Sequence, residues 1–383
     1  METVARIMRE LSETIGPRFS ASDGEHAAAE LLAKEFANAG LAPRLQRLNF
    51  VGWSATSTPQ LQVLEPHPRA VPAAPVVYSA PARQLRGQLA RLGRRALIEG
   101  LYEMDTLAVL DEEGTPAAVL VVNPRGGAIP LINPRPLYRM PQLVIAKEDA
   151  EILLADIDAG TPVSVQLDFE SELNPDAYSF NVVSSYRGNP DTDEHIVVCA
   201  HYDTQIGSPG AYDNASGTAG MFGILEHLLQ TKAPVNVTFI GIAGEEVGMF
   251  GSEFYVNDLV ERGLLKHVRY CVCLDQISGG EFFWLWCTDP DLRRAGQEAI
   301  AAAGISELGP VHVDDNKPGA DHWAFHARGV PACLLMWWRQ EDYHRSSDTF
   351  DKADMNRAQV AVAAACNLVD TLAKEMAQEK ATR

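Results

Sequence analysis

Two histidines and four carboxylates lie just after apolar stretches of this sequence. These residues are His201, Asp203, Glu245, Glu246, Asp275 and His344. A set of imidazole nitrogens and carboxylate oxygens suits ions such as zinc, manganese or cobalt. Calcium sites use oxygen ligands, so a set with two imidazoles does not fit calcium. The residue types therefore predict a transition-metal centre.

A seventh candidate ligand, Asp213, lies in the glycine-rich stretch "GSPGAYDNASG" that follows the first histidine. If one carboxylate is shared, the set can hold two ions about 3.5–4 Å apart, which is the arrangement that activates a water molecule between metals. One carboxylate then remains as a base. The adjacent residues Glu245 and Glu246 can supply a ligand and a base from the same turn.

The candidate ligands need a scaffold that aims them at one place. The apolar runs 195–200, 235–244, 270–274 and 331–337 read as strands covered on both faces. Helical patterns lie between or after them, at 217–230, 290–304 and 355–375. Alternating strands and helices predict an α/β fold with a mainly parallel sheet, whose working site lies beyond the carboxyl ends of the strands.

The first half of the chain differs from the second in composition and hydropathy pattern. Apolar residues at helical spacing open the sequence, and a second helix is predicted from a capping box, Ser22 and Glu25, to a stop at Gly40. From residue 52 the sequence becomes rich in proline and short strand-like runs. We therefore expect N-terminal helices of the main domain (1–51), a strand-rich inserted domain (52–173) and the main domain proper (174–383).

Charge excludes some partners. The 51 acidic residues exceed the 32 basic ones and leave a net charge of −19, which argues against nucleic acid and against an anionic membrane as partners. The N-terminal stretch lacks a signal-peptide pattern, and the six cysteines, which lie mostly in apolar runs, read as buried free thiols. We expect a cytoplasmic protein, and the oligomeric state stays open.

The motifs around these residues resemble peptidase family M28, the dinuclear zinc aminopeptidases. In chain order they are "HYDT", "GAYDNASGTAG", "GEEVGMFGS", "LDQIS", "GADHWAFHARGVPA" and "YHRSSDT". The resemblance covers the opening helices and the region from about Phe180 to the C-terminus. It implies a zinc-exopeptidase-like fold. More weakly, the inserted region resembles a protease-associated (PA) domain.

The resemblance also implies a role for each site residue. His201 and Asp275 would bind one zinc, Glu246 and His344 the other, and Asp213 would bridge the two ions. Glu245 would be the general base, Asp203 would orient the His201 ring, and Tyr343 would steady the oxyanion of the tetrahedral intermediate. The peptide bond between Asp213 and Asn214 would be cis.

The function implied is a metal-dependent exopeptidase that removes N-terminal residues from peptides or small amides. A metal-bridging hydroxide would attack the carbonyl, with Glu245 taking its proton. The cofactor would be two Zn²⁺ per chain, for which Co²⁺ or Mn²⁺ could substitute. Two alternatives stay open at this point: a glutaminyl cyclase with a single zinc, and a non-catalytic binding protein of the receptor type. Retention of His201, Asp275 and the shared Asp213 favours the two-metal hydrolase.

Overall fold

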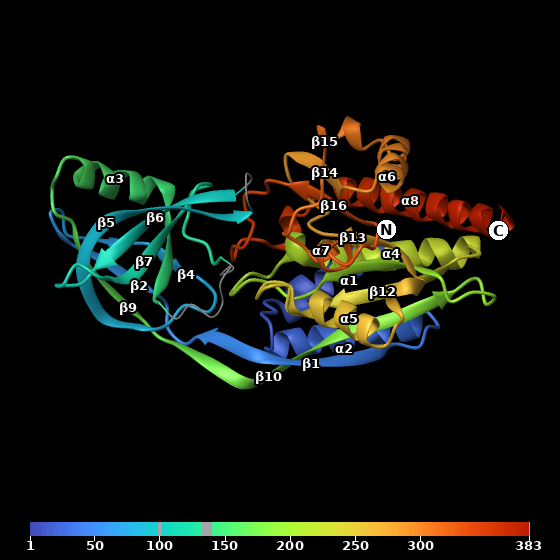
Figure 1. Ribbon diagram of the computed structural model, residues 1–383, viewed down its shortest axis with the longest axis horizontal. Helices are drawn as coiled ribbons and strands as arrows, with labels where there is room; N and C mark the ends of the chain where they lie inside the picture. The colour runs from blue at the N-terminus through green and yellow to red at the C-terminus, as the bar shows by residue number, and fades with distance from the viewer. Residues whose placement is uncertain (99–101, 132–139, 383) are drawn as a thin grey trace. The chain divides into compact units, whose positions relative to one another are not determined.

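The computed structural model describes residues 1–98, 102–131 and 140–382, which divide into two compact units (Figure 1). One unit comprises Met1–Leu48 with Tyr178–Arg383, and the other comprises Asn49–Ala177. The borders expected from the sequence, at residues 52 and 173, fall just inside the second unit.

The first unit is built on a mixed sheet with the strand order β1-β10-β12-β11-β13-β16-β14-β15. The strands are β1 (Arg44–Ala55), β10 (Ser171–Arg187), β11 (His195–His201), β12 (Asn236–Ile242), β13 (Val268–Leu274), β14 (Phe282–Cys287), β15 (Val311–Asp314) and β16 (Ala332–Trp338). The four predicted apolar strands are β11, β12, β13 and β16, and they are parallel neighbours at the centre. Antiparallel pairs join β10 to β12 and β14 to β16. The predicted mainly parallel mixed sheet is confirmed.

Helices cover both faces of this sheet. They are α1 (Glu2–Arg9), α2 (Asp23–Asn38), α4 (Ser216–Thr231), α5 (Phe250–Glu261), α6 (Pro290–Ala302), α7 (His322–His326) and α8 (Met355–Thr382). Successive residues of a strand point to opposite faces. Phe239 of β12 packs near Phe36 of α2, whereas the preceding residue, Thr238, lines a groove together with Tyr255 of α5. The helices α2 and α5 therefore lie on opposite faces.

The N-terminal helices begin and end largely as their sequence predicts. The Ser22 side chain accepts a hydrogen bond from the Glu25 amide at 3.2 Å, and Gly40 adopts a φ of +83° just beyond the end of α2. The Glu25 carboxylate accepts from the amide of Ala21 at 2.6 Å, where a capping box would use the Ser22 amide. The first helix is shorter than its apolar pattern, since Glu10–Ile15 form a π-helical turn.

The second unit contains a separate sheet with the order β3-β2-β9-β5-β6-β7-β8-β4. Its elements are β2 (Gln60–Glu65), β3 (Arg69–Val71), β4 (Ala73–Pro75), β5 (Ala82–Ile98), β6 (Tyr102–Leu110), β7 (Pro116–Asn123), β8 (Gln142–Ala146), α3 (Lys147–Asp158) and β9 (Ser164–Phe169). Strands β7 and β8 are parallel and the other pairs are antiparallel. The unit is rich in strands, and its resemblance to a PA domain stays a prediction.

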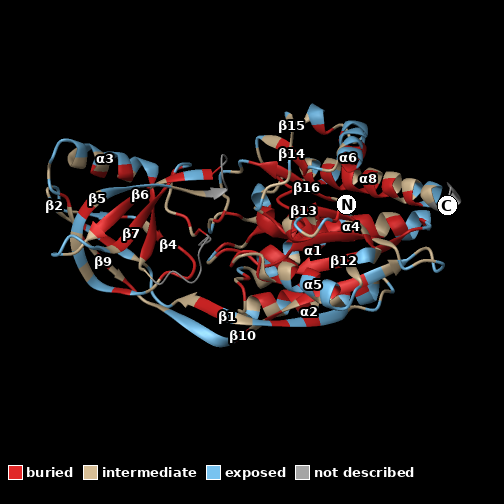
Figure 2. Cartoon of the chain, viewed as in Figure 1, coloured by how far each residue is buried: buried red, intermediate tan, exposed pale blue. Residues whose placement is uncertain are grey.

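Burial follows the strands of the first unit. Figure 2 shows β12, β13 and β16 as buried, and every residue of β12 and β16 is buried. All six cysteines are free and buried, as predicted. Within the described residues, no helix is both long enough and apolar enough to span a bilayer. The cytoplasmic location stays a prediction.

Candidate metal centre

Three neighbouring strands deliver candidate ligands to one edge of the first sheet. His201 is the last residue of β11, and Asp275 follows the last residue of β13. Both strands are parallel and adjacent, so their carboxyl ends meet at the same edge. His344 comes from the loop after β16, the next strand along.

Glu245 and Glu246 lie in a tight turn after β12. Gly244 and Gly248 have φ values of +68° and +126°, in the region that favours glycine. The Glu245 carbonyl accepts hydrogen bonds from the amides of Gly248 and Met249, at 2.9 and 2.8 Å. The backbone therefore turns at the doublet, which lets two adjacent side chains reach the same site.

Asp213 lies in the loop between β11 and α4, within the irregular turn Ala211–Ala215. Its backbone is not helical, with φ −116° and ψ 95°. The peptide bond from Asp213 to Asn214 is cis, as the resemblance implies. This loop carries the Asp213 carboxylate in between the two histidines.

The two oxygens of Asp213 face different histidines. Oδ1 lies 3.3 Å from His201 Nε2, and Oδ2 lies 3.3 Å from His344 Nε2. His201 Nε2 is also 3.4 Å from Asp275 Oδ1, and His344 Nε2 is 3.3 Å from Glu246 Oε2. The cluster therefore has two halves that share one carboxylate, and the halves are those implied by the resemblance.

The cluster fits divalent cations by its charge and by its unpartnered atoms. Asp213, Glu246 and Asp275 are buried, and each has one oxygen without a hydrogen-bond partner in the described structure. Candidate ligand atoms of His201, Asp213 and Glu246 lie within 4.8 Å of one another. Buried carboxylates gathered at one point require compensating positive charge. Nitrogen and carboxylate donors together select ions of the zinc type.

The pKa values in the cluster also indicate a site that favours bound positive charge. Burial lowers the pKa of His344, but the carboxylates of Glu246 and Asp213 outweigh burial and raise it to about 10. Burial raises the pKa of Asp213, yet the adjacent imidazoles of His201 and His344 outweigh burial and the pKa falls below its ordinary value. In the metal-free site, protonated imidazoles thus supply the positive charge that metal ions would supply.

Comparison with known proteins identifies the family. The sequence model of peptidase family M28 matches residues 181–369 of this chain. This region is an M28 peptidase domain. The chain is therefore a hydrolase of the metallopeptidase type.

Two groups of relatives are similar to the chain. The aminopeptidase YwaD of Bacillus subtilis is 24% identical over 377 residues, covering 92% of this chain and 80% of the relative. Leucine aminopeptidase 2 of Trichophyton rubrum is 32% identical over 143 residues, which span 37% of this chain and 28% of the fungal protein.

Two solved structures share the fold over nearly the whole chain. The zinc aminopeptidase BSAP of Bacillus subtilis has a TM-score of 0.71 at 21% identity, with 97% of this chain and 94% of that chain covered. A peptidase M28 precursor of Shewanella amazonensis has a TM-score of 0.77 at 19% identity, with coverages of 97% and 93%.

In the M28 domain, Asp203 contacts the turn that carries the glutamate pair. Its two carboxylate oxygens accept hydrogen bonds from the amides of Glu245 and Glu246, at 3.2 and 3.1 Å. His201 Nδ1 lies 3.2 Å from the main-chain carbonyl of Asp203 and 3.5 Å from its carboxylate. The nearer acceptor for the His201 ring is thus the Asp203 carbonyl, while the carboxylate joins the end of β11 to the turn that carries the glutamate pair.

Glu245 and Tyr343 border the cluster. Burial raises the pKa of Glu245 well above its ordinary range, although the charge of His201 opposes the rise. The Tyr343 ring stacks on the His344 ring, with centroids 3.7 Å apart, and meets Trp338 edge to face at 5.7 Å. The Tyr343 ring therefore packs against a candidate ligand.

Asp348 supports the Asp213 loop and was missed in reasoning from the sequence. Its carboxylate oxygens accept hydrogen bonds from the amides of Tyr212 and Asp213, at 2.8 and 3.1 Å. Burial raises its pKa to about 7. The motif "YHRSSDT" contains Asp348, but only the folded chain shows that it reaches the amide of Asp213.

Arg18 is a second residue that the sequence did not reveal. It is fully buried, and its guanidinium nitrogens lie within hydrogen-bond distance of five main-chain carbonyls. The acceptors belong to Leu11, Gly16, Tyr202, Pro209 and Gly210, at 2.7–3.1 Å. Arg18 thus joins the N-terminal helices to the loop that carries Asp213.

Proposed function

We propose that this chain is a zinc-dependent aminopeptidase that removes N-terminal residues from peptides or small amides. The observation that carries the proposal is the buried cluster centred on Asp213, whose two oxygens face two different histidines. His201 and Asp275 would hold one ion, and Glu246 and His344 a second. Asp213 would be shared between them.

The metal would supply the electrophilic part of the reaction. Zinc held by this set of ligands polarises a carbonyl and lowers the pKa of a water molecule. Asp203 contributes by fixing the turn of the glutamate pair, and Asp348 by fixing the Asp213 amide.

Glu245 would move the proton. It takes a proton from the attacking water, whose oxygen bonds to the scissile carbonyl carbon. It then delivers that proton to the peptide nitrogen as the carbon–nitrogen bond breaks. Its buried position beside the cluster, with a raised pKa, suits a group that must accept a proton and release it again. Tyr343 would steady the oxyanion.

The specificity for the N-terminus rests on the relatives. The similar proteins from Bacillus subtilis and Trichophyton rubrum are named aminopeptidases. An aminopeptidase must recognise the free α-amine of its substrate next to the scissile bond.

The test compares substrates with and without a free amine. Zinc-loaded protein should cleave leucyl p-nitroanilide and should not cleave N-acetyl-leucyl p-nitroanilide, with metal content measured on the same sample. Equal cleavage of both substrates would exclude an aminopeptidase. Release of ammonia from glutaminyl peptides, with one ion per chain and no hydrolysis, would instead indicate a cyclase.

A further inference from the structure

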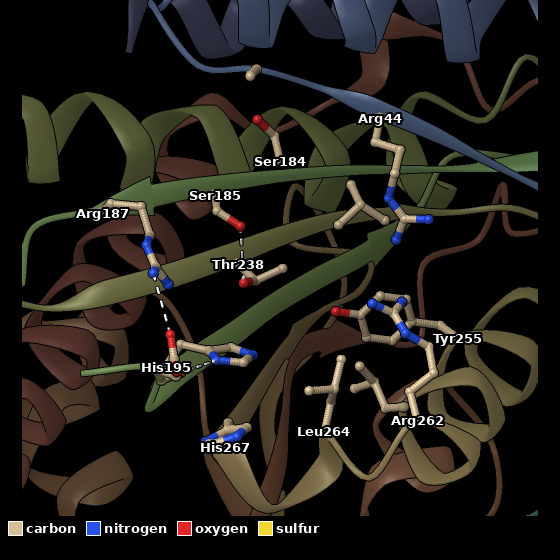
Figure 3. Close-up of a pocket in the computed structure, with 14 residues that line it drawn as sticks. Arg44, Ser184, Ser185, Arg187, His195, Thr238, Tyr255, Arg262, Leu264 and His267 are labelled. Carbon is tan, nitrogen blue, oxygen red and sulfur yellow. Dashed lines mark hydrogen bonds and ion pairs between the residues drawn. The ribbon is translucent and has the colours of Figure 1, made fainter. Parts of the chain in front are cut away.

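A hollow separate from the metal cluster lies in the first unit, on the sheet face covered by α5. It has a volume of about 710 Å³. Residues from β10, β11 and β12 form one wall, and α5 with the following turn, Leu265–His267, forms the other. Figure 3 shows Thr238 and Tyr255 on the two sides of the space between the strands and the helix, with Ser184 pointing away from it. Hollows of this size hold small molecules.

The lining is basic, although the chain as a whole is acidic. The five basic side chains that line the groove are Arg44, Arg187, His195, Arg262 and His267. Asp193 is the one acidic residue among the fourteen that line it. In a chain of net charge −19, this concentration of positive charge is a local exception. A cleft lined by charges of one sign attracts ligands of the opposite sign.

The positive charges are only weakly compensated. Arg187 pairs with Asp193 at 3.4 Å, and Arg262 pairs with Asp258 at 3.0 Å. Both arginine side chains are 54% exposed, and ion pairs this exposed contribute little. Arg44 is exposed and makes no ion pair within the described part of the chain.

His195 is affected by burial and by this positive charge. Burial lowers the pKa of His195, and the nearby His267 and Arg187 lower it further, against a hydrogen bond to Asp193. That bond joins His195 Nδ1 to the Asp193 carbonyl at 2.9 Å. A carbonyl only accepts, so Nδ1 carries the hydrogen and Nε2 is left for another partner.

Hydroxyl groups lie between the basic side chains. Ser185 and Thr238 are opposite each other on β10 and β12, with their oxygens 3.2 Å apart. In Figure 3, Arg187 and His195 lie on one side of this pair, and Arg44 and Arg262 lie on the other. A ligand spanning the groove would therefore meet positive charge at both ends and hydroxyls between them.

We propose that this groove binds a small polyanion, a molecule with two or more phosphate or carboxylate groups. Guanidinium groups bind both kinds of oxyanion through paired charge-assisted hydrogen bonds. The groove is separate from the metal centre. His195 and His201 lie at opposite ends of β11, a separation of roughly 20 Å for a strand of this length. The ligand can therefore bind while a substrate occupies the metal centre.

The test uses calorimetric titration of the metal-loaded protein with tripolyphosphate and, separately, with the tricarboxylate tricarballylate. The groove variant is R44Q/R262Q, which removes two positive charges at one end. The matched control is R9Q/R294Q, which removes two positive charges from exposed arginines outside the lining. Losing two charge-assisted contacts should weaken binding by at least about tenfold in the groove variant, and the control should stay within about twofold of wild type.

The two titrants distinguish the source of the oxyanion. Binding of tripolyphosphate alone supports a phosphate ligand, and binding of tricarballylate alone supports a polycarboxylate. Binding of neither titrant to the wild type would overturn the proposal. Binding that R44Q/R262Q retains unchanged would also overturn it, because such binding does not depend on the groove arginines. The single variant R44Q, at an exposed side chain, checks the result if the double variant unfolds at a lower temperature.

Discussion

At the residue scale, the site depends on adjacent side chains doing different work. Glu246 Oε2 faces His344 at 3.3 Å, inside the cluster. Glu245 is buried next to it and is close enough to His201 for their charges to interact. The turn at Gly244 and Gly248 lets both adjacent side chains reach the site.

The first prediction separates the two glutamates. Glu246→Gln removes a charged ligand oxygen, so metal affinity should fall and activity should partly return at high zinc. Glu245→Gln removes only the proton carrier, so metal content and KM should stay near wild type while kcat falls by about 10²–10⁴-fold. Metal analysis and steady-state kinetics on both variants decide the matter. Metal loss in Glu245→Gln, with retained metal and no turnover in Glu246→Gln, would reverse the assignment.

The second prediction concerns pH. The metal-free site raises the pKa of His344 to about 10, so below that pH its imidazole holds a proton that an incoming metal ion must displace. Metal affinity should therefore rise with pH, by about tenfold per unit for each displaced proton. Competition with a chelator of known affinity at pH 6.5, 7.5 and 8.5 measures this. An affinity that is constant over this range would show that His344 is not a ligand.

At the element scale, the loop between β11 and α4 needs support from distant parts of the chain. The Asp348 carboxylate, after β16, accepts from two of its amides, and Arg18, before α2, donates to three of its carbonyls. The Asn214 side chain also accepts from the Gly217 and Gln276 amides, at 2.8 and 3.1 Å. Several elements therefore hold Asp213 in its position.

The third prediction tests Arg18. Arg18→Leu would leave five carbonyls without their charged donor, of which those of Leu11, Tyr202 and Gly210 are buried. The free energy of unfolding should fall by at least about 3 kcal/mol, because each unsatisfied buried group costs about 1–3 kcal/mol. Arg294→Leu, at a side chain that is 52% exposed, is the control and should change stability by less than about 1 kcal/mol. Urea unfolding of both variants gives the comparison. An equal loss of unfolding free energy in the two variants would show that the buried contacts of Arg18 stabilise the fold no more than those of an exposed arginine.

At the scale of the whole molecule, both candidate sites belong to one of the two units. The cluster centred on Asp213 and the basic groove are built from residues of the first unit. The second unit has its own sheet and its own buried core, including Leu107, Leu120 and Val144. Each unit can therefore be altered while the core of the other is kept.

The fourth prediction is that the second unit is dispensable for metal binding. Excising residues 49–177 and joining Leu48 to Tyr178 by a short Gly-Ser linker should leave the metal content per chain unchanged. Cleavage of a small p-nitroanilide should persist, whereas selectivity for long peptides should change. Elemental analysis and activity on the shortened protein provide the measurement. A cooperatively folded core without metal would show that the second unit contributes to the site.

The sequence by itself determined the central strands, because buried parallel strands are continuous apolar runs, and it indicated which polar residues follow them. It did not reveal β5, whose sequence "ARQLRGQLARLGRRALI" lacks such a run: this strand is stabilised by pairing with β6 and β9. Tertiary structure alone decided that Asp348 and Arg18 hold the Asp213 loop, and that basic residues from 44 to 267 line one groove. Those contacts join residues far apart in the chain, and local patterns of hydropathy carry no information about which distant residues will meet.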